Sequence, residues 1–212
     1  MSHRELAQDI KTKNIIEMAL AFTAMMRVFS ERSNAAIGGR LAQLFARLDR
    51  IAETEDYERA HTDFCNWFTQ TVRTAEKTLK NGRIKPSGAS SYGQAAKVLD
   101  ISAKVYVYYC AQPSDAAGRR LVPMLHGAVD TPIMRFLASR YPEVGVRSKT
   151  IQEVDREEYE RLQSLVARDI EASFQSQIYP VQYDDIMWRR LNRAGTPANQ
   201  GMHPTGQNAA GG

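Results

Sequence analysis

A short segment near the middle of the chain carries the side chains best suited to chemistry. Arg119 and Arg120 are followed by His126, and Asp130 lies four residues further on. Histidine titrates near neutral pH, so it can move protons during a reaction. Arginine stays charged and offers a planar fork that matches a phosphate group. We therefore predict Arg120 and His126 as catalytic candidates and Arg119 as a candidate ligand-binding cation.

Five residues separate Arg120 from His126. This spacing resembles the arginine–histidine motif of the HEPN family, which consists of helical-bundle proteins and includes metal-independent ribonucleases. The resemblance covers seven residues. It implies that His126 transfers a proton and that Arg120 stabilises the charge on a phosphate. It also implies a homodimer, in which the two side chains share a cleft with their counterparts.

A structural interpretation of the same residues competes with the catalytic one. Arg120 would be a surface cation, and His126 would lie at the end of a short helix before Gly127, where its positive charge is favoured. Pro123 lies between them and interrupts any continuous helix. Both interpretations remain open at this stage.

No other motif in the sequence indicates a particular reaction. His126 and Asp130 have the spacing of a helical metal pair, but Gly127 and the helix start expected at Thr131 argue against a continuous helix there. No second pair of ligands has a matching spacing, so we predict no metal site and no cofactor. A nucleophile elbow and a dinucleotide-binding fingerprint are also absent.

A second group of polar residues follows one line of an otherwise apolar helix. They are Gln94, Lys97, Asp100 and Lys104, spaced by three, three and four residues, which places them on one face. In one interpretation, Asp100 bridges the two lysines along an exposed edge. In the other, Lys97, Asp100 and Lys104 line a groove that holds an anionic ligand. The degree of burial of the lysines distinguishes the two interpretations, because a buried lysine needs a partner of opposite charge.

These residues must be positioned by helices, since apolar residues recur with a helical period along most of the chain. The expected helices cover residues 4–29, 37–51, 54–79, 91–111, 131–141, 150–174 and 183–191. Ser91 with Gln94, and Thr150 with Glu153, have the spacing of capping boxes. Residues 105–109 read VYVYY and have a high strand propensity, but the helical period continues through them. We predict an all-α, single-domain bundle of about six to eight helices, with a central and mostly buried helix near 91–111.

The end of the chain has a different composition. Residues 194–212 contain five glycines and no charged residue. Such a segment has too little apolar surface to bury, so we predict a disordered low-complexity tail after a domain of residues 1–193.

Composition sets the remaining expectations. The chain has 212 residues, of which 43% are hydrophobic and 25% charged, a profile typical of globular proteins. Two cysteines without disulfide or metal spacing, and no signal peptide, lead us to expect a cytoplasmic protein. The apolar run at residues 18–26 is too short to span a membrane, and we predict no membrane association.

Charge provides the only general indication of a partner. The net charge is +4, and residues 73–85 contain five basic residues and one acidic residue. We therefore expect a helical interaction or ligand-binding protein with a basic surface, whose partner is an anion such as a nucleic acid or a phosphate ligand. A HEPN-like metal-independent endoribonuclease that uses Arg120 and His126 is the alternative.

Overall fold

The computed structural model describes residues 2–78 and 80–194, and this part of the chain is almost entirely helical. The α-helices are α1 (His3–Phe22), α2 (Glu31–Phe45), α3 (Thr54–Thr71), α4 (Tyr92–Ala103), α5 (Asp115–Leu121), α6 (Thr131–Arg140), α7 (Arg156–Phe174) and α8 (Pro180–Ala194). Short helical segments are η1 (Ala24–Val28), η2 (Leu48–Arg50), η3 (Lys104–Tyr109), η4 (Val122–Met124), η5 (Pro142–Val144) and η6 (Ile151–Glu153). The prediction of an all-α fold is confirmed.

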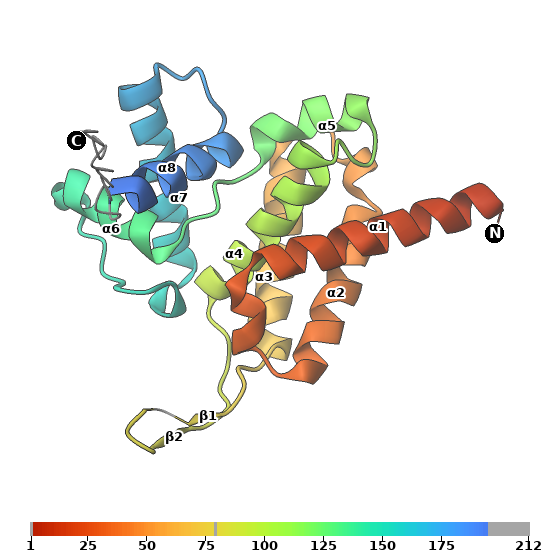
Figure 1. Ribbon diagram of the computed structural model, residues 1–212. Helices are drawn as coiled ribbons and strands as arrows, with labels where there is room; N and C mark the ends of the chain where they lie inside the picture. The colour runs from red at the N-terminus through yellow and green to blue at the C-terminus, as the bar shows by residue number, and fades with distance from the viewer. Residues whose placement is uncertain (1, 79, 195–212) are drawn as a thin grey trace, which may run out of the picture.

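Helix α4 lies at the centre of the molecule. It contacts α1 and α3 on one side and α7 on the other (Figure 1). Within α4, every residue except Lys97 and Ile101 is buried. Buried apolar residues from α1 through α8 join it in one hydrophobic core. The predicted central position of this helix is therefore confirmed.

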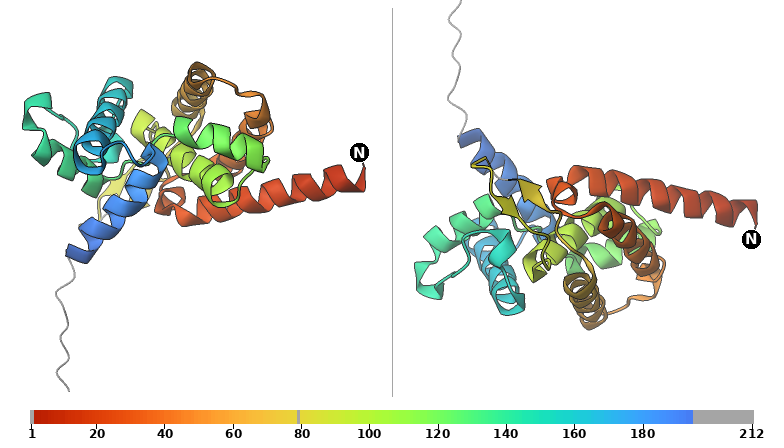
Figure 2. Two further views of the ribbon diagram at one scale, coloured as in Figure 1. Left: turned by 90° about the horizontal axis from the view of Figure 1, so that it is seen from above. Right: turned by 90° about the horizontal axis from the view of Figure 1, so that it is seen from below.

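Two elements extend from this body. The N-terminal half of α1 projects away from the other helices in all three views (Figures 1 and 2). The strands β1 (Lys77–Thr78) and β2 (Ile84–Lys85) form a small antiparallel hairpin, in a region where the sequence predicted the end of a helix and a loop.

The two ends of the central helix differ in regularity. At its start, the Ser91 hydroxyl accepts a hydrogen bond from the amide of Gln94, and the Gln94 side chain accepts one from the amide of Ser91, as the capping-box pattern predicted. After Ala103 the chain continues as the π-helix η3. The aromatic and β-branched run therefore forms neither a strand nor a regular α-helix. Four successive residues, 104–107, are buried there, which fits a helix surrounded by protein.

Several predicted helix boundaries are wrong. Helix α1 ends at Phe22 rather than residue 29, because Thr23 starts a separate turn by accepting a hydrogen bond from the amide of Met25. Helix α2 starts at Glu31 rather than residue 37 and ends at Phe45 rather than residue 51. Before α7, Thr150 and Glu153 lie at the two ends of the short turn η6, whereas the sequence predicted that they start the long helix. Asp155 caps the long helix instead, since its carboxylate accepts the amide of Glu158.

None of the helices in residues 2–78 and 80–194 is long and apolar enough to cross a membrane. The predicted C-terminal tail lies outside the described residues, apart from Ala194, with which α8 ends.

Candidate functional site

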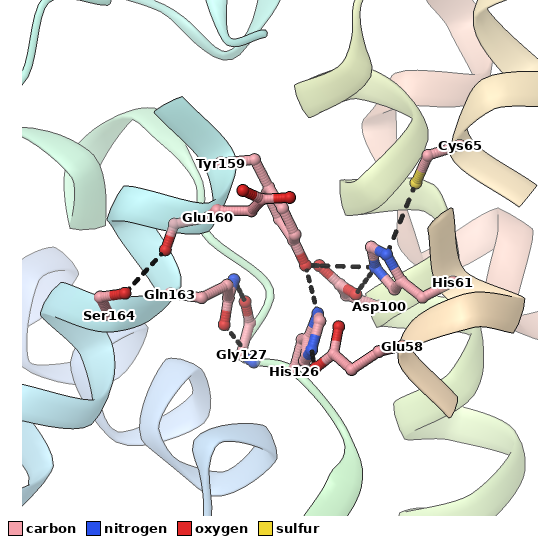
Figure 3. A network of polar contacts seen from close by, with 10 residues as sticks. All are labelled: Glu58, His61, Cys65, Asp100, His126, Gly127, Tyr159, Glu160, Gln163 and Ser164. Atoms are coloured by element: carbon pink, nitrogen blue, oxygen red, sulfur yellow. Dashed lines mark hydrogen bonds and ion pairs between the residues drawn. The ribbon is translucent and has the colours of Figure 1, made fainter. Parts of the chain in front are cut away.

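Five polar side chains meet between α3, α4 and α7, and we call them the histidine cluster (Figure 3). On α3 and α4, His61 Nε2 lies 3.0 Å from Asp100 Oδ1. The Tyr159 hydroxyl, on α7, lies 2.9 Å from Asp100 Oδ2, 3.2 Å from His61 Nε2 and 2.8 Å from His126 Nδ1. The other ring nitrogen of His126 lies 2.7 Å from Glu58 Oε1. The cluster thus joins residues that are far apart in the sequence.

The loop between η4 and α6 brings His126 into this position. Gln163 on α7 holds the loop from both sides, because its side chain accepts a hydrogen bond from the amide of Gly127 and donates one to the carbonyl of Gly127. A Cβ atom at Gly127 would lie only 2.8 Å from the carbonyl oxygen of Pro180. Only glycine therefore lets the loop pack this closely against the start of α8 and place His126 beside Tyr159.

The acidity of Tyr159 and Glu58 indicates which groups donate and which accept in this network. Burial, together with the charge of Asp100, raises the pKa of Tyr159 well above its usual value, so the hydroxyl keeps its proton and donates it to Asp100. His126 must then donate from Nδ1 to the Tyr159 oxygen. Its other nitrogen donates to Glu58, whose pKa is lowered by this hydrogen bond.

His61 makes a different set of contacts within the cluster. Its Nε2 carries a proton that it donates to Asp100, and its Nδ1 lies 3.7 Å from the sulfur of Cys65. Burial raises the pKa of the Cys65 thiol, so this sulfur remains protonated and can donate weakly to the ring. The histidine cluster thus holds two imidazoles, two carboxylates and one tyrosine hydroxyl within hydrogen-bonding distance of one another.

A pocket of about 390 Å³ opens onto this cluster, and we call it the histidine pocket. The His126 side chain, which is 13% exposed, and Glu58, which is 50% exposed, lie on its wall, with Glu160 nearby. No lysine or arginine of the described residues lines it. The histidine pocket therefore favours cations over anions.

The two arginines predicted from the sequence lie elsewhere. Arg120 donates from Nε to the carbonyl of Ile51 and from Nη2 to the carbonyl of Asp49, both at 2.8 Å. Arg119 lines a separate pocket with residues of η3 and with Tyr179. The hydrogen bonds of Arg120 and His126 thus go to different partners, because the turn η4, which contains Pro123, separates α5 from the loop of His126.

Lys97 and Lys104 line a second pocket of about 380 Å³, which we call the lysine pocket. Residues from the end of α1, α4, η3, the loop before α6, α6 and α8 surround it. Asp100 is absent from its lining, since its carboxylate bonds to His61 and Tyr159. The interpretation in which Asp100 bridges the two lysines is therefore wrong, whereas the two lysines do share a pocket.

The two lysines differ in their partners. Lys104 Nζ hydrogen-bonds to Asp184 and Asp185 on α8. Burial alone would lower the pKa of Lys104, but the two carboxylates outweigh burial and raise it. Lys97 makes no hydrogen bond and no ion pair with any residue that the structure describes. Burial lowers the pKa of Lys97, with partial compensation from the charges of Asp130 and Asp184.

The lysine pocket also contains an acceptor without a donor and three aromatic side chains. Asp184 Oδ1 is buried, and among the described residues it has no hydrogen-bond partner. Burial raises the pKa of Asp184 to about 7. Phe22, Tyr109 and Trp188 line the same pocket, and each is at least half exposed. Large exposed aromatic groups gathered in one pocket are typical of binding sites.

Sequence patterns alone missed most of these residues. His61 has the position of a packing residue on α3, and Tyr159 has that of a core residue on α7. The prediction of no metal site considered only spacings within one segment, whereas the histidine cluster takes its members from four. For Glu58 the one available signal was its place three residues before His61, on the same helix face.

Comparison with known proteins finds no matching family model, no similar curated protein and no similar solved structure. The function must therefore be inferred from the two pockets.

Proposed function

We propose that this protein binds a small ligand, and that the lysine pocket holds a planar anion of the nucleotide class. The support comes from Lys97, whose ammonium group is partly removed from water, makes no hydrogen bond or ion pair with a described residue, and is only partly compensated by the charges of Asp130 and Asp184. A buried cation is stable only when something compensates its lost hydration. An anionic group of a ligand would provide that compensation.

Other groups in the lysine pocket restrict the ligand further. The carboxylates of Asp130 and Asp184 would repel a bare anion, so the ligand also needs a hydrogen-bond donor for the free oxygen of Asp184. The aromatic groups favour a flat ring, and stacking of a base on an aromatic side chain contributes about 1–3 kcal/mol. A mononucleotide has all three features: a phosphate, N–H donors on the ring or its amino group, and a planar base.

Replacing Lys97 tests this proposal directly. We expect Lys97→Met to weaken mononucleotide binding by roughly 10- to 100-fold, because a hydrogen bond to a charged group contributes about 1.5–3 kcal/mol. Methionine keeps the length and the apolar stem of lysine. Binding of AMP, GMP, CMP and UMP is measured by calorimetry and by tryptophan fluorescence, since Trp188 lines the pocket.

The matched control is Lys77→Met, at an exposed lysine on β1. This variant should bind like the unmodified protein. Equal affinities of Lys97→Met and the unmodified protein would contradict the proposal, as would the absence of saturable binding for all four nucleotides.

A metal-independent endoribonuclease centred on His126 is the second candidate function. One observation favours it: His126 lies at the wall of a pocket, a suitable position for a proton-transfer group. The absence of lysine and arginine from the lining of the histidine pocket, and the bonds of Arg120 to backbone carbonyls, favour ligand binding instead.

This candidate predicts cleavage of single-stranded RNA in the presence of a chelator, with a loss of about 10²- to 10⁴-fold in His126→Ala. Gel analysis of a labelled RNA provides the measurement. Equal cleavage by both proteins, or none by either, would remove the enzymatic function.

A further inference from the structure

The histidine cluster gathers donor atoms around one point. One donor atom each from His61, Asp100 and His126 lies within 4.8 Å of the other two. The three residues come from α3, from α4 and from the loop before α6. Imidazole nitrogens and carboxylate oxygens are the usual protein ligands of Zn²⁺ and other first-row dications.

We infer that His61, Asp100 and His126 form a binding site for a divalent transition metal, with Zn²⁺ as the reference ion. The Tyr159 hydroxyl marks the centre of the site, because its oxygen lies 2.8–3.2 Å from one donor atom of each residue. Metal–ligand bonds to nitrogen and oxygen are about 2.0–2.2 Å long, so each donor needs to move inward by roughly 1 Å. The ion takes the place of the hydroxyl, and its binding requires that His61 Nε2 and His126 Nδ1 give up the protons they carry in the hydrogen-bond network.

The surroundings of the three ligands match those of metal sites. His126 presents Nδ1 to the centre, and its outer nitrogen is held by Glu58 at 2.7 Å. A carboxylate on the outer nitrogen is the common arrangement for a metal-binding histidine, since it fixes the ring orientation. Glu58 and Glu160, together with the lack of lysine and arginine in the lining, give the histidine pocket the charge that attracts a dication.

The site is also accessible. The histidine pocket, of about 390 Å³, includes both His61 and His126 in its lining. Three protein ligands beside an open pocket leave a coordination position for water or a substrate, as in catalytic rather than structural zinc sites. A purely structural network of hydrogen bonds would give the same contacts but no stoichiometric metal affinity.

Metal titration of the full chain tests the inference. After chelator treatment and dialysis, Co²⁺ is added and its visible absorption recorded, and Zn²⁺ is then added as a competitor. We expect one equivalent to bind, with an affinity at least 100-fold lower in His126→Ala. Glu58→Gln should bind about 10- to 100-fold more weakly, because it removes the carboxylate that orients the ring.

Two further variants complete the experiment. His3→Ala, on the exposed start of α1, controls for nonspecific binding by histidine and should not change the affinity. Lys97→Met should also bind metal normally, which separates this site from nucleotide binding in the lysine pocket. Circular dichroism verifies that each variant is folded. If His126→Ala does not fold, Glu58→Gln still tests the inference, because Glu58 is half exposed and its replacement disturbs the core less. No stoichiometric binding by the unmodified protein, or unchanged binding by Glu58→Gln and every folded His126 variant, would overturn the inference.

Discussion

Asp100→Ala is expected to lower the free energy of unfolding by about 3–5 kcal/mol. Asp100 is almost completely buried, and its two oxygens accept hydrogen bonds from His61 and Tyr159. Without the carboxylate, both donors stay inside the protein with no acceptor, and each unsatisfied group costs about 1–3 kcal/mol. Urea denaturation in the presence of a chelator measures this loss without any contribution from bound metal.

The matched control is Asp63→Ala, at an exposed aspartate of α3. Surface substitutions of this kind usually change stability by less than about 0.5 kcal/mol. A similar result for Asp100→Ala would mean that the histidine cluster contributes nothing to the stability of the fold. The large difference expected here depends on hydrogen bonds and not on the net charge of the protein, since both variants remove one aspartate.

Gly93→Ala is expected to destabilise the protein by about 2–3 kcal/mol. A Cβ atom at this position would lie 2.6 Å from Val154 Cβ and 2.7 Å from the carbonyl oxygen of Ile151. The amide of Gly93 also donates to the carbonyl of Val154, so α4 cannot move away from η6 without losing this bond. The contact with backbone atoms therefore outweighs the gain of about 1 kcal/mol that alanine usually brings to a helix.

Gly39→Ala in α2 provides the opposite case. No heavy atom lies within 4 Å of a Cβ atom at Gly39, so this substitution should stabilise the protein by about 0.5–1 kcal/mol. Thermal and urea unfolding of both variants measure the change in the free energy of unfolding, which should be negative for Gly93→Ala and positive for Gly39→Ala. Two stabilising substitutions would show that η6 packs less closely against α4 than described.

The structural features that depend on residues close together in the chain could be predicted from the sequence. The helical period gave the all-α class, and the spacing of Ser91 and Gln94 gave the start of α4, because both residues bond within one turn. The same logic failed at α7, where two adjacent capping patterns compete and Asp155 caps the long helix. Local spacing does not decide between neighbouring caps when the intervening residues can form a short turn of their own.

The candidate sites depended on distant residues and were predicted only in part. The spacing of Lys97 and Lys104 placed both on one helix face, and both line the lysine pocket, but Asp184, which binds Lys104, is 80 residues further along the chain. Similarly, His61 and Tyr159 are 98 residues apart. No periodicity within a helix indicates which helices will pack together, so these partners could not be recognised from the sequence.

The π-helix η3 also bears on how this protein can change during evolution. A π-helix uses wider turns than an α-helix, and such segments are rare and frequently lie at functional sites. Lys104 and Tyr109, at its two ends, both line the lysine pocket. Deleting one residue between them would rotate Tyr109 relative to Lys104, by about 100° if the segment became a regular α-helix. A single codon lost or gained here would therefore change the shape of the lysine pocket while both of these residues remain in the chain.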